Sequence, residues 1–163
     1  MLERCDLQNC LSGSDGMSMD HTSGYPTEFI ADILQHVKTV AVIGASPNPA
    51  RPSNEVARFL MDGGYEVIPV NPNAVGQSLN GRPFVASLAE IDKPVDMVDV
   101  FRASAALCDV AREAIGIGAR VLWSQLGVYD IRAAEMAEAA GMQVVMNRCP
   151  KIEIKRLNLR RAG

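Results

Sequence analysis

The chain has 163 residues and a formal net charge of −3 at neutral pH, and 48% of its residues are hydrophobic. This composition suits one domain with a substantial core, and the slightly negative charge argues against general affinity for nucleic acid. No apolar run approaches the roughly 18 residues that a membrane helix needs. The N-terminal segment lacks the basic stretch followed by an apolar one that is typical of a signal peptide. We therefore expect a cytoplasmic protein.

The cysteines and histidines argue against a zinc site. No two cysteines form a C-x-x-C pair, and both histidines precede the predicted sheet. Such a pattern suits free thiols in a reducing cytosol. The residues concerned are Cys5, Cys10, Cys108, Cys149, His21 and His36.

The first 26 residues are polar, rich in glycine, serine and aspartate, and without periodicity. We interpret residues 1–26 as a disordered or loosely packed arm and residues 27–163 as the folded domain. Thr27 is the expected N-cap of a first helix, whose apolar residues recur at helical spacing. These residues are Phe29, Ile30, Ile33, Leu34 and Val37.

The segment TVAVIGASPNPARPS follows, from Thr39 to Ser53. Its first five residues, Thr39–Ile43, suit a strand that is buried on both faces. Gly44 allows a sharp turn and a close approach of a ligand to the backbone. Ser53 is the expected N-cap of the next helix. Strand, glycine turn and helix N-terminus together favour a bound phosphate.

Strands and helices alternate regularly through the remainder of the chain. Pro69 removes a hydrogen-bond donor from its strand, so we expect a bulge or a strand end there. The alternation predicts an α/β fold with a single doubly wound, Rossmann-like parallel sheet of five strands in the order 3-2-1-4-5, with helices on both faces. The further strands are expected at residues 66–71, 95–101, 119–123 and 143–146, short turns at 73–83 and 87–91, and helices from Ser104, Asp130 and Lys151.

Polar residues follow the predicted strands, at the edge where such sheets bind ligands. They include three arginines and several neutral hydrogen-bonding groups, and no carboxylate. A rim of this kind suits a polyanion, most simply a phosphorylated nucleotide. The alternative is that the arginines are solvated and point apart. The arginines are Arg51, Arg102 and Arg148.

The nicotinamide dinucleotide fingerprint is incomplete. Of the pattern G-x-G-x-x-G only the first glycine, Gly44, is present, and the second strand ends in Asn71 and Pro72 rather than in an acidic residue. Both departures count against NAD, and the phosphate loop of ATP-binding proteins is absent as well.

Five segments, in order, resemble the family of stand-alone coenzyme A-binding proteins, which is similar to the N-terminal CoA-binding domain of the succinyl-CoA synthetase α subunit. The resemblance covers about residues 30–157. Together, in this order and at this spacing, the five segments are specific for this family. They read TVAVIGASPNPARPS, VIPVNPN, VDVFR, LWSQLGV and VMNRCPKIE.

The resemblance implies a site for coenzyme A or a short acyl-CoA. It assigns the phosphates to Gly44, Ala45, Ser46 and the loop to Ser53, with Arg51 as a charge partner, and the adenosine end to Asn71, Pro72 and Asn73. It places the middle of the ligand beside Val100, Phe101 and Arg102, the pantetheine arm beside Ser124, Gln125 and Gly127, and the far side at Asn147, Arg148 and Cys149.

No catalytic histidine, triad or metal site is apparent, so we favour binding without catalysis and leave enzymatic activity open. Cys149 is either a packing cysteine or a thiol that forms a mixed disulfide with CoA. We expect Asp99 to be a buried carboxylate satisfied by hydrogen-bond donors. Trp123 suits either the core or stacking on a base.

Two other functions stay open. One is a nicotinamide-nucleotide-binding oxidoreductase or redox sensor on the same fold, and the other is an interaction module without a small ligand. We expect no nucleic-acid or membrane partner. A homo-oligomer or a protein partner remains undecided by the sequence.

Overall fold

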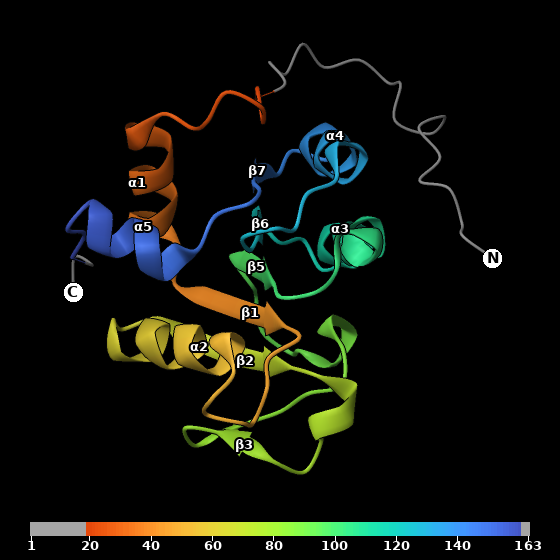
Figure 1. The fold of residues 1–163 in the computed structure, drawn as a ribbon. Helices are drawn as coiled ribbons and strands as arrows, with labels where there is room; N and C mark the ends of the chain where they lie inside the picture. The colour runs from red at the N-terminus through yellow and green to blue at the C-terminus, as the bar shows by residue number, and fades with distance from the viewer. Residues whose placement is uncertain (1–18, 161–163) are drawn as a thin grey trace.

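A parallel sheet of five strands forms the centre of the structure, a computed structural model that describes residues 19–160 (Figure 1). The α/β, doubly wound class is confirmed, and the predicted strand ends differ from the observed ones by at most two residues. In spatial order the strands are β2 (Glu66–Val70), β1 (Thr39–Ile43), β5 (Met97–Val100), β6 (Val121–Ser124) and β7 (Gln143–Val145).

The position of β5 corrects the predicted strand order. Numbered along the chain, the five strands lie in the order 2-1-3-4-5 rather than 3-2-1-4-5, because β5 pairs with β1, with Val42 opposite Asp99. The connection after β2 therefore passes back over β1. The winding of the sheet reverses between β1 and β5, which is where a sheet of this type binds its ligand.

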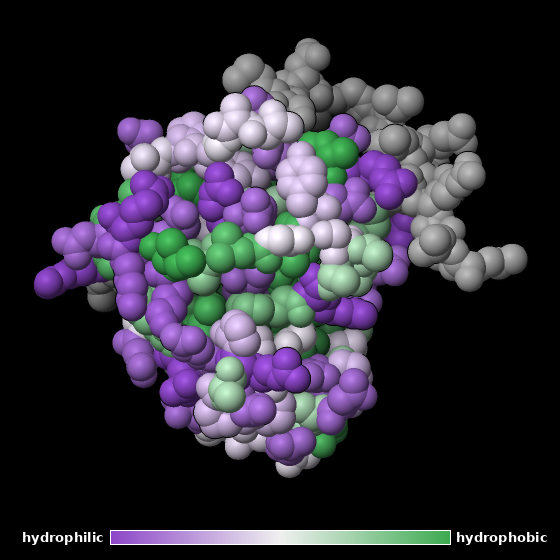
Figure 2. Space-filling view, viewed as in Figure 1, coloured by the Kyte–Doolittle hydropathy of each residue, from purple (hydrophilic) through white to green (hydrophobic). Residues whose placement is uncertain are grey.

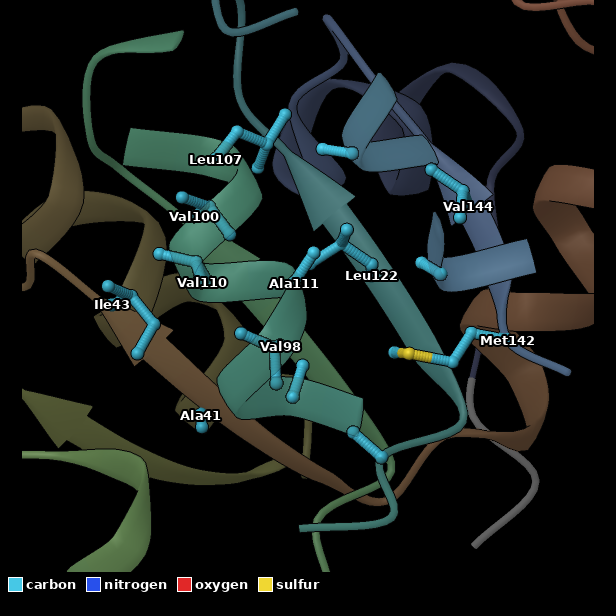
Figure 3. Close-up of a cluster of buried hydrophobic side chains, with 14 of the residues drawn as sticks. Ala41, Ile43, Val98, Val100, Leu107, Val110, Ala111, Leu122, Met142 and Val144 are labelled. Carbon is cyan, nitrogen blue, oxygen red and sulfur yellow. The ribbon is translucent and has the colours of Figure 1, made fainter. Parts of the chain in front are cut away.

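Helices cover both faces of the sheet (Figure 1). On one face, Val98 and Val100 of β5 pack with Leu107 and Ala111 in a buried cluster (Figure 3). Within residues 19–160, the helices are too short or too polar to cross a membrane. The first face carries α3 (Leu107–Gly116) and α4 (Ile131–Ala139), and the second carries α1 (Thr27–His36), α2 (Pro52–Asp62) and α5 (Pro150–Arg156).

The predicted helix caps were only partly right. Asp130 caps α4 as expected, since its side chain accepts from the Arg132 N–H. Thr27 and Ser53 instead lie inside the first turns of their helices, and Ser104 begins a short 3₁₀ turn before α3. The hydroxyls of Ser53 and Ser104 form hydrogen bonds with neighbouring loops. They therefore do not accept from the first N–H groups of a helix, as a cap would.

Pro69 causes no bulge. It pairs with Val42 in regular register on the edge strand β2, and its carbonyl accepts from the Val85 N–H on the outer side. A proline is tolerated at an edge because the missing donor faces away from the sheet. The connection to β5 contains 3₁₀ turns at Pro72–Ala74 and Leu88–Glu90 and a small antiparallel pair, β3 (Ser78–Leu79) and β4 (Arg82–Pro83).

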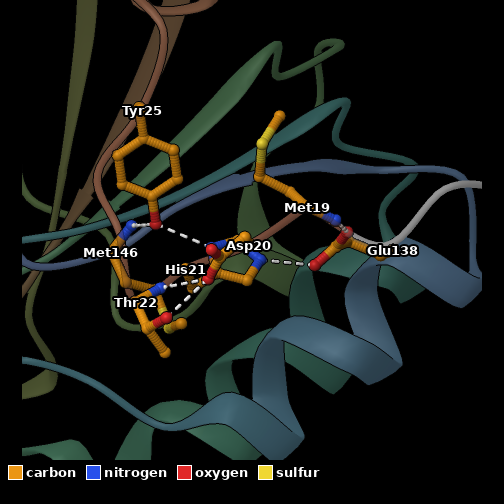
Figure 4. A network of polar contacts seen from close by, with 7 residues as sticks. All are labelled: Met19, Asp20, His21, Thr22, Tyr25, Glu138 and Met146. Atoms are coloured by element: carbon orange, nitrogen blue, oxygen red, sulfur yellow. Dashed lines mark hydrogen bonds and ion pairs between the residues drawn. The ribbon is translucent and has the colours of Figure 1, made fainter.

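Residues 19–26 pack against the domain, which corrects their assignment to a loosely packed arm. The buried His21 places Nε2 2.5 Å from Glu138 Oε1 on α4 and Nδ1 2.7 Å from the Tyr25 hydroxyl (Figure 4). That hydroxyl also accepts from the Met146 N–H at 2.8 Å. The polar side chains of this segment therefore satisfy one another against the fold. Residues 1–18 and 161–163 lie outside the described residues.

The cysteines correct the expectation of free thiols. Cys108 is disulfide-bonded, whereas Cys149 is free and buried. Cys5 and Cys10 lie outside the described residues. Sequence spacing does not reveal which thiols the fold brings together, because a disulfide depends on the distance between two residues in space.

Candidate ligand-binding site

Gly44 forms the turn at the end of β1. Its φ of +81° lies in the left-handed region that glycine adopts without strain, and its N–H donates to the Val70 carbonyl at 2.9 Å. A Cβ at this position would lie 2.4 Å from the Phe101 carbonyl oxygen and 3.3 Å from Arg102 Cγ. The ends of β1 and β5 thus meet at the reversal point with no room for a side chain.

The loop after Gly44 is held in shape by its own polar groups. The Ser46 N–H donates to Ser53 Oγ at 3.1 Å, and Asn54 Nδ2 donates to the Ser46 carbonyl at 2.8 Å. Ser53 therefore positions the loop instead of presenting its hydroxyl as a helix cap. Arg51 is the N-cap residue of α2, and its side chain is exposed.

A pocket of about 310 Å³ opens beside this turn, between the ends of β1 and β2 and the segment after β5. Asn71 lines it, but both ends of its amide are committed: Nδ2 donates to the Ala45 carbonyl at 2.9 Å, and Oδ1 accepts from the Asn73 N–H at 2.9 Å. Asn71 thus shapes the wall of the pocket. The other lining residues are Ile43, Gly44, Val70, Pro72, Asn73, Ala86, Ser87, Arg102 and Glu113.

The charges at the pocket differ in part from the prediction. Arg102 lines it with an exposed side chain, and across residues 19–160 neither Arg102 nor Arg51 has an ion pair or a side-chain hydrogen bond. Glu113, from α3, also lines the pocket and corrects the expectation of a rim without a carboxylate. Reasoning from strand ends missed it because it lies on a helix.

Two residues assigned to the middle of the ligand behave differently from each other. Val100 is fully buried and packs in the cluster beneath α3 (Figure 3), so it does not face the edge. Phe101 is half-buried and packs against the opposite cluster, on the side of α2 and α5. The side chains of Val100 and Phe101 point apart because alternate residues of a strand point to opposite faces.

The ends of β6 and β7 hold the remaining predicted residues, and their polar groups largely bond to one another. The fully buried Ser124 donates from Oγ to the Val128 carbonyl at 2.7 Å, so its hydroxyl cannot reach a ligand. The Gly127 N–H donates to Asn147 Oδ1 at 2.7 Å, and this bond ties the two loops together.

Arg148 is engaged with the protein. Its guanidinium lies 5.4 Å from the centre of the Tyr25 ring, and Nη1 donates to the Asn147 carbonyl at 2.8 Å. The Arg148 carbonyl accepts from Trp123 Nε1 at 2.9 Å. Trp123 itself is fully buried, which places it in the core and away from any stacking role.

Asp99 and Cys149 are buried titratable groups just behind the edge. Burial raises the pKa of Asp99 to about 7, and burial also raises the pKa of Cys149 above its usual range. Asp99 Oδ1 accepts from Gln125 Nε2 at 2.7 Å, but Oδ2 has no hydrogen-bond partner in the described part of the chain. The expectation of a fully satisfied carboxylate is therefore only half right.

The predicted residues thus gather in two groups on one edge. The pocket group contains Gly44, Asn71, Pro72, Asn73 and Arg102, and the second group follows β6 and β7. Sequence reasoning missed Ala86, Ser87 and Glu113 at the pocket and Tyr25 beside Arg148. No motif marks these residues, since they come from a connection, a helix and the N-terminal segment. In the view of Figure 2, hydrophobic surface forms a broken band between hydrophilic side chains.

A doubly wound sheet with a pocket at its reversal point defines a ligand-binding domain of the Rossmann type. The chain belongs to the family described as the CoA binding domain, which matches residues 38–155. The resemblance noted in the sequence is thereby confirmed at the level of the family.

Individual relatives agree with this assignment. The chain is 43% identical over 123 residues to the uncharacterized protein YneT of Bacillus subtilis, an alignment that covers 76% of this chain and 90% of that protein. The structure of cell-free ID.343 from Thermus thermophilus is 38% identical with a TM-score of 0.77, covering 82% of this chain and 99% of that one. A hypothetical protein from Pyrococcus horikoshii OT3 is 35% identical with a TM-score of 0.80, covering 86% and 98%.

Proposed function

We propose that this chain binds coenzyme A, or a short acyl-CoA, along the carboxyl edge of its sheet, without catalytic machinery of its own. The observation that carries the proposal is the pocket beside Gly44, where the Arg102 guanidinium lacks a partner among residues 19–160. Membership of the CoA binding domain family supports the choice of ligand. The expected cytoplasmic location remains part of the proposal.

The phosphates of the ligand suit the pocket end of the edge. Coenzyme A carries a diphosphate and a 3′-phosphate, and such anions favour arginine partners and helix N-termini. Arg102 and the exposed Arg51 offer two guanidinium groups, and Arg51 is also the N-cap residue of α2. Gly44 lines the same pocket, so its backbone is within reach of a ligand bound there.

The other end of the edge suits a neutral arm. Leu126 after β6 and Ile152 in the first turn of α5 are 59% and 50% exposed. Their apolar surface, together with the Gln125 amide, matches the mixture of methyl, methylene and amide groups in pantetheine. Exposed apolar side chains are typical of a surface that binds a ligand or a partner.

One observation favours the nicotinamide alternative. Glu113 lines the pocket, and a carboxylate there can accept hydrogen bonds from ribose hydroxyls in the way that the acidic residue of a dinucleotide site does. Against this alternative stand the missing second and third glycines and the commitment of the Asn71 amide to the Ala45 carbonyl and the Asn73 N–H.

A thermal-shift screen separates these functions, because a ligand that binds only the native state raises its stability. We expect CoA or acetyl-CoA to raise the melting temperature most, with NADH and ATP well behind. A largest shift with NADH would transfer the assignment to the nicotinamide alternative. No shift with any of the four would support an interaction module. The Arg102→Ala variant is the control, and it should lose most of the CoA shift.

A further inference from the structure

Asp99 has a buried oxygen without a partner at the centre of the sheet. It lies on β5 between Val42 of β1 and Trp123 of β6, next to the reversal of the winding. Within the part of the chain that the structure describes, Asp99 Oδ2 is the buried side-chain atom left without a hydrogen bond. Such an atom is costly, so it requires a reason beyond packing.

The other oxygen of Asp99 orients Gln125. Gln125 Nε2 donates to Asp99 Oδ1 at 2.7 Å, and an ionised carboxylate can only accept, so the amide nitrogen must face inward. Gln125 Oε1 has no hydrogen-bond partner within residues 19–160. It is absent from the set of buried unpaired atoms, so it is accessible to solvent. This oxygen therefore reaches the surface at the end of β6 as a hydrogen-bond acceptor.

Protonation of Asp99 changes this arrangement. A proton on Oδ1 turns this oxygen into an O–H donor that faces the amide nitrogen of Gln125. The amide oxygen of Gln125 can accept from it only after the amide has rotated. The rotated amide presents its nitrogen, a donor, at the surface. Cys149, at the start of α5, is the titratable group that interacts with Asp99, and a thiol is a weaker acceptor. No charged side chain of β1, α2, β6 or α5 contributes to the pKa of Asp99.

We propose that Asp99 is a positioning residue that, through Gln125, sets whether the site offers an acceptor or a donor to the amide-bearing arm of its ligand. The inference rests on the proposed function, since coenzyme A is the ligand that supplies such an arm. The ionised carboxylate makes Gln125 an acceptor for a pantetheine N–H. Binding then favours the ionised form, so affinity rises as the pH rises through the pKa of Asp99, which burial places at about 7.

The test compares the affinity for CoA of the wild type and the Asp99→Asn variant between pH 6 and pH 8 by calorimetry. If binding requires the ionised form, the wild type should bind about tenfold more tightly at the upper end of this range, by one-proton linkage. The ionisation of the ligand affects both proteins alike, so the ratio of the two affinities isolates Asp99. This ratio should change with pH, and a constant ratio would overturn the inference. Failure of CoA to bind either protein would instead overturn the proposed function.

A second measurement does not depend on the folding of the variant. The carboxyl titration of Asp99, followed by NMR in the wild type, should shift to lower pH when CoA is added, because linkage is reciprocal. Adenosine 3′,5′-bisphosphate lacks the pantetheine arm and should leave the titration in place. An equal shift with both ligands, or no shift with CoA bound, contradicts the role of Asp99.

Discussion

Both ends of the carboxyl edge of the sheet carry arginines, but only at one end are the arginines bound by other groups of the described part of the chain. At the β1 end, Arg102 and Arg51 have no partners within residues 19–160. At the β7 end, Arg148 lies over the Tyr25 ring and bonds to the Asn147 carbonyl. An arginine after a strand therefore indicates an anion site only where the fold leaves it unpaired. In the proposed function the β1 end is therefore the end that meets the phosphates, whereas the polar groups of the β7 end bond largely to one another.

The largest expected effect is that of Gly44→Ala, which should destroy the β1 end. Alanine would have to adopt the φ of +81° found at Gly44, and its Cβ would lie 2.4 Å from the Phe101 carbonyl oxygen. Strained backbone and overpacking each cost roughly 1–3 kcal/mol, so we expect a loss of unfolding free energy of about 3 kcal/mol or more, measured by urea denaturation. Gly118→Ala is the control, because Gly118 has a φ of +73° with open space around it. Equal losses in the two variants would rule out the close contact as the cause.

Next come the arginines, which compare the two ends directly. Arg102→Ala and Arg51→Ala should each weaken CoA binding by about 1–3 kcal/mol if they meet phosphates. Arg148→Ala should weaken it by less than about 0.5 kcal/mol, because the guanidinium is already engaged by the Tyr25 ring and the Asn147 carbonyl. Calorimetric titration with CoA measures all three. If Arg148→Ala proves as damaging as Arg102→Ala, the contrast between the ends is wrong.

A smaller effect is expected from Tyr25→Phe, which tests the β7 end without changing the charge of any side chain. The variant removes the hydroxyl that accepts from the Met146 N–H and contacts His21 but keeps the ring beneath Arg148. We expect about 1 kcal/mol less stability and unchanged affinity for CoA. Tyr129→Phe serves as the control, because Tyr129 is exposed and makes no side-chain hydrogen bond within residues 19–160. Weaker CoA binding in Tyr25→Phe alone would show that this end also serves the ligand.

The smallest effect concerns Cys149, where we expect no reaction. Its thiol is buried, and burial raises its pKa, so little thiolate is available to attack a disulfide. Peptide mapping by mass spectrometry after incubation with CoA disulfide should find no added mass on Cys149 in the folded protein. The same protein in urea should acquire it. Modification in the folded state would instead support the mixed-disulfide hypothesis and make the β7 end reactive.

The sequence by itself determined the class of fold, the edge at which the candidate site lies and the family. Apolar runs and glycine turns depend on local chemistry, and TVAVI followed by Gly44 predicts a buried strand and a turn wherever the strand is placed. The helical stripe that includes Ile30 and Leu34 was predictable for the same reason, and both residues are buried.

Only the tertiary structure decided the strand order, the packing of residues 19–26 and the division of the edge into two ends. β5 pairs with β1 in the structure. The apolar strands have similar sequences, so the sequence does not show which of them pairs with β1. His21 and Glu138 are 117 residues apart, yet they meet across the fold. Whether an arginine binds a ligand or a tyrosine depends on which groups lie around it, and neighbours in space cannot be read from neighbours in the chain.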